Sequence, residues 1–235
     1  MYIGITERGD AGLDFSWENT LYKANILITK HVNDEFIKKV LNHKDKIIVH
    51  ATVTGFGGTI LEPNVPDYHS SYISLAKLIM FGFPTNQIVL RIDPIISTPK
   101  GLNTVENILK EFVHLNIQRC RFSFLDIYPH VKQRFKENKV KLPYETFTAP
   151  QYMIDNALQV LKEYEGVYQF ESCAENTPYQ LGCISEKDLK VLGINMEVKD
   201  GGFQRKGCLC LGNKKELLNN KKQCTSKCLY CYWKN

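Results

Sequence analysis

The chain has 235 residues, of which 43% are hydrophobic and 23% are charged, and its formal net charge is +5. This size suits one large domain with a buried core, and the 15 glycines and 9 prolines exclude a collagen-like or disordered chain. Residues 1–10 become charged too early for a secretory signal, and the longest apolar stretch, residues 73–83, is too short to span a bilayer. We therefore expect a cytoplasmic protein without a membrane partner.

Short β-branched runs alternate with longer helical patterns along the chain. Strands are expected at residues 2–6, 25–29, 46–54, 87–93, 119–126, 167–173 and 193–198. Helices are expected at residues 34–41, 70–80, 104–115, 128–137, 150–164 and 185–192. Such alternation produces βαβ units with parallel pairing. The prediction is an α/β fold, a complete or partial (β/α) TIM-like barrel over residues 1–200. A cysteine-rich iron–sulfur tail, residues 201–235, would pack on it. A doubly wound open sheet is the alternative, which the absence of a G-x-G-x-x-G after the first strand weakens.

Polar residues stand where several of the expected strands end. In a parallel barrel the reactive groups gather at the carboxyl ends of the strands. The candidate catalytic or binding residues at these ends are Arg91, Asp93, Asp126, Glu171 and Glu175. For any one of them, a helix cap, a turn or a buried ion pair is the alternative role.

A glycine-rich turn follows the third expected strand. Its backbone amides can face a carboxylate or a phosphate, so Thr54, Gly55 and Gly57 are candidate cofactor-binding residues.

Eight cysteines in a cytosolic chain indicate metal or redox chemistry rather than disulfides. Three of them, Cys224, Cys228 and Cys231, form a C-x3-C-x2-C motif. Three thiolates leave a four-ligand centre one ligand short, and an open position distinguishes a reactive metal site from a closed structural one. Zinc would have to recruit a further ligand, because no histidine follows His130.

Four more cysteines can form a second cluster or a zinc site, and they are Cys173, Cys183, Cys208 and Cys210. The alternative is that Cys173 and Cys183 are small buried residues, and we expect Cys120, inside a strand, to be part of the core.

The positive charge gathers towards the end of the chain. From Arg205 onward the lysines are Lys206, Lys214, Lys215, Lys221, Lys222, Lys227 and Lys234, with Glu216 the single acid. This stretch would contact nucleic acid, form a solvated surface, or offset the charge of a thiolate cluster.

The spacing of the C-terminal motif resembles that of radical S-adenosylmethionine (SAM) enzymes. The resemblance implies a [4Fe–4S] cluster on the three cysteines, SAM as cofactor, and an electron donor such as a flavodoxin or ferredoxin. Tyr230 matches the aromatic residue that lies against the adenine in those enzymes. There the motif follows the first strand. Here it follows the last expected strand, which a nearly closed barrel would bring beside the first.

Seven further segments carry a second resemblance. They are residues 52–57 (TVTGFG), 61–66 (LEPNVP), 91–95 (RIDPI), 123–128 (SFLDIY), 173–175 (CAE) and 182–184 (GCI), together with Cys208-x-Cys210. With the terminal motif they resemble a family catalogued as a domain of unknown function, DUF1848. The closing Cys-Leu-Tyr-Cys-Tyr also looks like the motif of spore photoproduct lyase, a radical SAM DNA-repair enzyme. The chain departs at residues 7–10 (ERGD), where the family has an Arg-Arg-Thr-Asp-like stretch, although Asp10 matches.

The leading hypothesis is a radical SAM-like enzyme whose substrate is a small molecule or a nucleic acid. The competing hypothesis is a nucleic-acid-binding or redox module, held together by zinc or an inert Fe–S cluster, without SAM chemistry.

Overall fold

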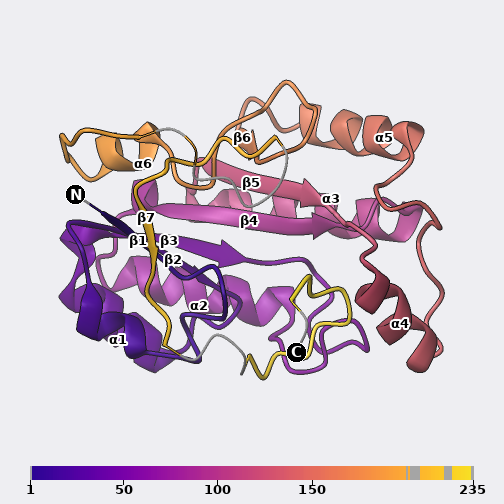
Figure 1. Cartoon of the computed structure of the whole chain (residues 1–235), viewed down its shortest axis with the longest axis horizontal. Helices are drawn as coiled ribbons and strands as arrows, with labels where there is room; N and C mark the ends of the chain where they lie inside the picture. The colour runs from indigo at the N-terminus through magenta and orange to yellow at the C-terminus, as the bar shows by residue number, and fades with distance from the viewer. Residues whose placement is uncertain (1, 200, 202–206, 220–223, 234–235) are drawn as a thin grey trace.

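A seven-stranded parallel sheet forms the frame of the molecule, as the computed structural model shows for residues 2–199, 201, 207–219 and 224–233 (Figure 1). The strand order is β6-β5-β4-β3-β2-β1-β7, and every neighbouring pair is parallel. The strands are β1 (Ile3–Ile5), β2 (Ala24–Thr29), β3 (Ile47–Thr52), β4 (Ile88–Ile95), β5 (Arg119–Phe124), β6 (Gln169–Ser172) and β7 (Lys214–Glu216). The structure thus confirms an α/β fold.

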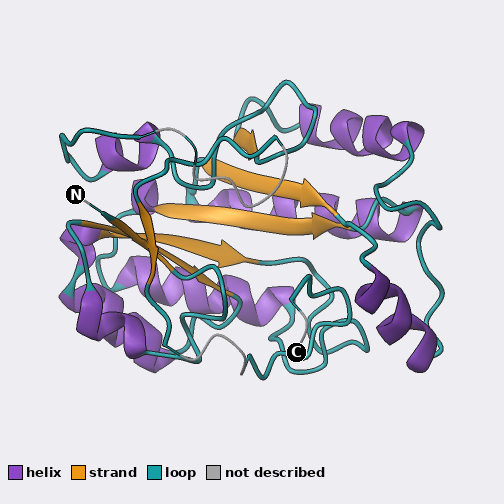
Figure 2. Cartoon of the chain, viewed as in Figure 1, coloured by secondary structure: helices purple, strands orange, loops and turns teal. Residues whose placement is uncertain are grey.

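Helices connect the strands (Figure 2). They are α1 (Asp34–Asn42), α2 (Tyr68–Met80), α3 (Pro99–Phe112), α4 (Pro129–Glu137), α5 (Gln151–Lys162) and α6 (Glu186–Val191). Four short 3-10 helices lie at Ser16–Thr20, Lys44–Lys46, Thr85–Gln87 and Val113–Leu115. The side chains of Asn33, Asp67 and Thr98 cap α1, α2 and α3 by accepting a hydrogen bond from a first-turn amide. No helix in the described part of the chain has the length and apolarity to cross a bilayer.

The sheet is open. From β1 to β6 the order follows the sequence, as successive βαβ units produce it, but β6 and β7 are the two edges and do not pair within the described residues. The described residues therefore do not form the complete barrel that was predicted.

The seventh strand lies elsewhere than expected. Residues 193–198 form no strand, and Lys214–Glu216 pairs with β1 instead. Lys214 binds the carboxylate of Glu7 at 3.1 Å, and the Glu216 carboxylate accepts hydrogen bonds from the amides of Glu7 and Arg8. An edge strand can consist of charged residues because its side chains meet solvent and loops. The apolar residues of 193–198 instead cover the sheet.

Two separate cores cover the two faces of the sheet. The larger one contains Leu27, Val49 and Leu90 and packs against the helices. The alternate residues Ile26, Ile48 and Val89 face the other way, as the period of a strand requires, and form a smaller core with Ile184, Leu189 and Leu211. We call this second side the inner face. The described residues that cover it run from Ile184 to Val198 and include Leu211, which directly follows Cys210.

Candidate functional site

A cavity of about 660 Å³ lies at the carboxyl ends of the strands. Its size is in the ~300–1,000 Å³ range of small-molecule sites. Seven of the eight cysteines line it, and they are Cys173, Cys183, Cys208, Cys210, Cys224, Cys228 and Cys231. The fold thus brings both predicted cysteine groups to one space.

The first group is assembled from distant parts of the chain. The Sγ atom of Cys173 lies 3.8 Å from the Sγ atoms of both Cys208 and Cys210, and the three sulfurs lie within 4.8 Å of one another. All three residues are buried. The amide of Cys183 donates to the Cys210 sulfur at 3.1 Å. These cysteines can hold a metal ion. With Cys183 they form what we call the four-cysteine group.

Cys183 is the cysteine of this group that carries negative charge most readily. Hydrogen bonds from Cys173 and Cys210 lower the pKa of its thiol well below the ordinary value, and the positive charges of Arg121 and Arg91 lower it further against the effect of burial. A thiolate is the form that binds metal.

Close backbone contact explains how the group assembles. A Cβ atom at Gly182 would lie 2.3 Å from the carbonyl oxygen of Leu209, so only glycine allows these two segments to touch. One residue further along each segment, Cys183 meets Cys210, and the Leu211 amide donates to the Ile184 carbonyl at 3.1 Å.

The second group, which we call the tail group, consists of Cys224, Cys228 and Cys231. The Cys231 amide donates to the Cys228 carbonyl at 3.1 Å in a tight turn, after Lys227 with φ of 53°. Among the described residues, one set of three potential metal ligands has its ligand atoms within 4.8 Å of one another, and that set is Cys173, Cys208 and Cys210. The tail sulfurs would therefore have to draw together around a metal. Burial raises the pKa of Cys228 to about 12, although the charge of Lys30 opposes this rise.

Backbone contacts bind the tail to the loop after β3. The Leu229 amide donates to the Leu61 carbonyl at 3.0 Å, and the Asn64 side chain donates to the Thr225 carbonyl at 2.7 Å. In Figure 1 the yellow tail and the purple loop after β3 lie side by side.

Arg134 on α4 and the loop after β1 bind the end of the tail. The Arg134 guanidinium donates to the carbonyls of Cys231 and Trp233, each at 2.6 Å. Tyr232 and Trp233 donate to the carbonyl of Glu7 at 3.1 and 3.2 Å. The tail thus lies beside the loop after β1, because β7 pairs with β1. The contact between the tail and this loop therefore does not require a closed barrel.

A buried polar network fixes Tyr230, the predicted cofactor-binding aromatic residue. Its hydroxyl donates to Glu62 and lies 3.2 Å from the Lys30 ammonium, which binds Glu62 at 2.6 Å. The predicted residue Thr54 donates to the other Glu62 oxygen at 2.6 Å. Burial alone would raise the pKa of Glu62, but the Lys30 charge and the hydrogen bonds lower it overall. Neither Lys30 nor Glu62 was predicted as a site residue, although Glu62 lies in the 61–66 segment that carries the family resemblance.

Three of the five predicted strand-end residues line the cavity, and they are Arg91, Asp93 and Asp126. The Arg91 guanidinium donates to Asp93 through Nε at 2.6 Å, and the Ser123 hydroxyl also donates to Asp93. The Nη1 atom of Arg91 has no hydrogen-bond partner among the described residues.

Glu171 and Glu175 do not line the cavity. Glu171 is 2% exposed and accepts hydrogen bonds from Arg119, Arg121 and Lys187. Burial raises the pKa of its carboxyl, but the charges of Arg121 and Arg119 outweigh this effect and lower it. Glu171 therefore belongs to a buried ion network, and Glu175 accepts a hydrogen bond from the Phe124 amide at 3.2 Å.

Two inner-face residues, Arg121 and His50, were also not predicted. Arg121 lines the cavity, and the alternation in Arg119-Cys-Arg121-Phe-Ser123-Phe is a signal that charged residues share one face of β5. His50 is fully buried, and neither ring nitrogen has a hydrogen-bond partner among the described residues. Burial, and then the charges of Arg121 and Arg91, hold the pKa of His50 well below 6.5, so its ring is neutral.

Packing accounts for the glycine-rich turn. A Cβ at Gly57 would lie 1.9 Å from the Pro66 carbonyl oxygen, and Gly55 has φ of 78°. The Gly58 amide donates to the Glu62 carbonyl at 3.0 Å. Neither Gly55 nor Gly57 lines the cavity, so the binding of an anion by this turn stays a prediction.

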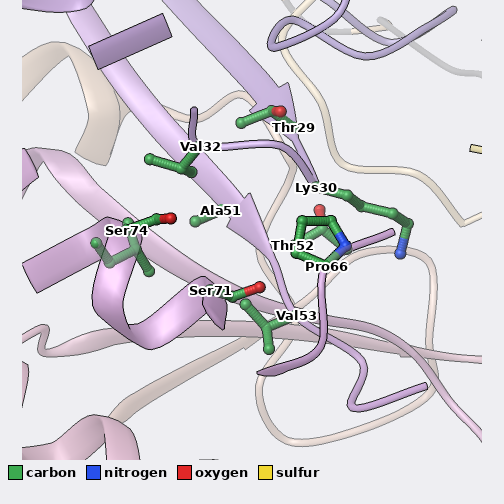
Figure 3. Close-up of a pocket in the computed structure, with 10 residues that line it drawn as sticks. Thr29, Lys30, Val32, Ala51, Thr52, Val53, Pro66, Ser71 and Ser74 are labelled. Atoms are coloured by element: carbon green, nitrogen blue, oxygen red, sulfur yellow. The ribbon is translucent and has the colours of Figure 1, made fainter. Parts of the chain in front are cut away.

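A second, small pocket lies between β2, β3 and the start of α2. Figure 3 shows Ser71 and Ser74 on one side of it and Lys30 reaching away from them. Its volume of about 10 Å³ is room for one water molecule, which excludes it as a substrate site.

Part of the predicted basic stretch falls outside the described residues, namely Arg205, Lys206, Lys221, Lys222 and Lys234. Of the described lysines, Lys214 binds Glu7, and the ammonium of Lys215 lies 4.9 Å from the ring centre of Tyr2.

No curated protein matches the chain at a significant level. A family model does match, over residues 16–233, and its description is a domain of unknown function (DUF1848). Because the match covers nearly the whole chain, the protein belongs to the DUF1848 family.

Proposed function

We propose that the protein is a radical SAM-like iron–sulfur enzyme. Cys224, Cys228 and Cys231 hold a [4Fe–4S] cluster with one open position, and SAM and the substrate occupy the adjoining cavity. A bound cluster, once reduced by an external electron donor, would supply the one electron that splits the C5′–S bond of SAM into methionine and a 5′-deoxyadenosyl radical.

One observation carries this proposal. Three cysteines with C-x3-C-x2-C spacing line a cavity of about 660 Å³, and no fourth cysteine lies within that motif. A closed structural site would need no such space, whereas an open coordination position needs room for a ligand.

The side chains around the cavity suit a charged ligand. Arg91 offers a free Nη1 to a carboxylate, while Asp126 lines the same wall. Asp93 holds the Arg91 guanidinium in place, and Lys30 and Glu62 fix the Tyr230 ring at the cavity wall.

The test is SAM cleavage by anaerobically purified protein after reconstitution with iron and sulfide. With dithionite and SAM, the full chain should release 5′-deoxyadenosine, and Cys228→Ala should not. Cys120→Ala is the matched control, because Cys120 is buried in β5 outside both groups. A loaded wild-type protein that makes no 5′-deoxyadenosine would disprove the proposal.

A second candidate function is a metal-bound module without SAM chemistry. It is favoured by the four-cysteine group, which has the close sulfurs typical of a closed metal site. In addition, His31 lies near the tail group, with its Nε2 atom 2.9 Å from the Ser226 hydroxyl. Zinc in both groups, with no SAM binding, would support this alternative.

A further inference from the structure

The four-cysteine group needs positive charge nearby. Four thiolates around one divalent metal, or around one oxidised [4Fe–4S] cluster, leave a net charge of two negative units. Burying such a charge costs several kcal/mol per ion unless an opposite charge lies close by. Cys173, Cys208 and Cys210 are buried, so the counter-charge must be part of the protein.

Arg121 meets this need. It is 1% exposed, and it lines the same cavity as the four cysteines. One of its amino groups, Nη2, donates to Glu171. The other two nitrogens, Nε and Nη1, are buried and have no hydrogen-bond partner among the described residues. Leaving such donors unsatisfied is costly, which points to an acceptor that the protein atoms do not provide.

The sheet places a second arginine beside the first. Arg91 on β4 and Arg121 on β5 are direct partners in the parallel register and face the same side. Like charges on neighbouring strands repel each other unless a negative group lies near both. Both arginines line the cavity that Cys183 also lines, so a thiolate centre there lies near both charges.

We propose that Arg121, assisted by Arg91, is the counter-charge of a dianionic four-thiolate metal centre at Cys173, Cys183, Cys208 and Cys210. Arg121 acts as a positioning residue that offers its two free nitrogens to the sulfur ligands, and Glu171 holds it in place. This inference goes beyond the proposed function, with which it shares the cavity and Arg91, and its main residue, Arg121, has no part in that function. It does not depend on SAM.

The experiment uses full-length protein in which Cys224, Cys228 and Cys231 are all alanine, so that one centre remains. The protein is purified anaerobically, its native metal is identified, and it is loaded with iron and sulfide or with zinc accordingly. Arg121→Gln should lower metal affinity, measured by competition with a chelator, by about 10- to 100-fold, as loss of an outer contact to a metal ligand typically does. If the centre is an iron–sulfur cluster, its midpoint potential should also become more negative. Arg121→Lys, which keeps the positive charge, should show smaller changes in metal affinity and in midpoint potential than Arg121→Gln.

Arg119→Gln is the matched control, because Arg119 is also buried on the same strand but does not line the cavity, and Glu171 and Asp188 bind it. It should keep the metal affinity of the parent. Should Arg121→Gln not fold, Arg91→Gln is measured in its place, since Arg91 is 16% exposed in its side chain. Unchanged affinity and potential in the variants, or no metal at all in the parent, would overturn the inference. Failure of the loaded wild-type protein to cleave SAM would contradict only the proposed function.

Discussion

The two cysteine groups that line the cavity are built in opposite ways. The four-cysteine group gathers Cys173, Cys183 and the Cys208–Cys210 pair from separate segments and brings sulfurs to 3.8 Å. The tail group is one local motif whose sulfurs lie further apart and whose backbone is bound by other residues. A preformed group suits a closed, permanent metal centre, whereas a looser one suits a centre that exchanges a ligand. The difference teaches that motif spacing and spatial assembly are independent signals of metal binding.

Removal of one sulfur from each group is the strongest test of this difference. Cys210→Ser should abolish metal at the four-cysteine group and destabilise the protein by several kcal/mol, because zinc binding in small cysteine sites is worth about 10–16 kcal/mol. Cys228→Ser should remove the tail metal with a much smaller loss of stability. Metal analysis and anaerobic urea unfolding check both variants. Equal destabilisation by the two would remove the distinction between the groups.

The buried Lys30–Glu62 pair should be the main support of the tail group. Glu62 is 1% exposed and the Lys30 side chain 15%, so Glu62→Ala leaves a mostly buried ammonium unpaired and should cost about 3 kcal/mol in urea unfolding. The control is the solvent-exposed pair Lys132–Glu145, where Lys132→Ala should cost less than about 1 kcal/mol. Similar costs for both variants would show that the network does not anchor the tail.

Arg134 should affect the tail group alone. Arg134→Ala removes two charge-assisted hydrogen bonds to the carbonyls of Cys231 and Trp233, worth about 1.5–3 kcal/mol. Amide hydrogen exchange in residues 224–233 should accelerate, while metal content at the four-cysteine group stays as in the wild type. The neighbouring exposed residue Lys136 supplies the control, since Lys136→Ala breaks no contact to the tail. Faster exchange throughout the sheet would instead indicate general unfolding.

The buried His50 should give the stability of the fold a distinct pH dependence. Its pKa is depressed in the folded protein, so the unfolded chain binds the extra proton and stability falls as the pH drops below 6.5. The slope from this one residue is about 1.4 kcal/mol per pH unit, and stability above pH 6.5 is unaffected. His50→Asn should flatten the curve between pH 6.5 and 5.5 relative to the wild type. Parallel curves would show that His50 is protonated inside the fold.

Much of the frame follows from local sequence patterns. Strands β1 to β6 and helices α1 to α6 lie where β-branched runs and helical periodicity predict them, within a few residues. Strand β7 could not be predicted, because Lys-Lys-Glu has low strand propensity. It pairs because β1 offers a free edge of the sheet. Ile194, Met196 and Val198 alternate like a strand but serve as cover for the inner face.

Candidate site residues could be chosen from the sequence where residue type and motif spacing indicate metal binding or charge. The seven cysteines of the two groups line the cavity together with Arg91, Asp93 and Asp126, and their roles stay predictions. Lys30, Glu62, Arg121 and His50 were missed because their roles depend on burial and on neighbours from other strands. Glu171 has the residue type and position of a strand-end acid, yet its charge is used within the sheet by Arg119 and Arg121.

The open sheet gives the four-cysteine group a further consequence. Cys173 directly follows β6, at one edge of the sheet, and Cys210 shortly precedes β7, at the other edge. A metal bound to both would link the two edges by coordination bonds, where a barrel would use hydrogen bonds. Such a cross-link closes a long loop and so reduces the entropy of the unfolded chain. Metal binding would then join β6 to β7, the two edge strands that do not pair with each other in the described part of the chain.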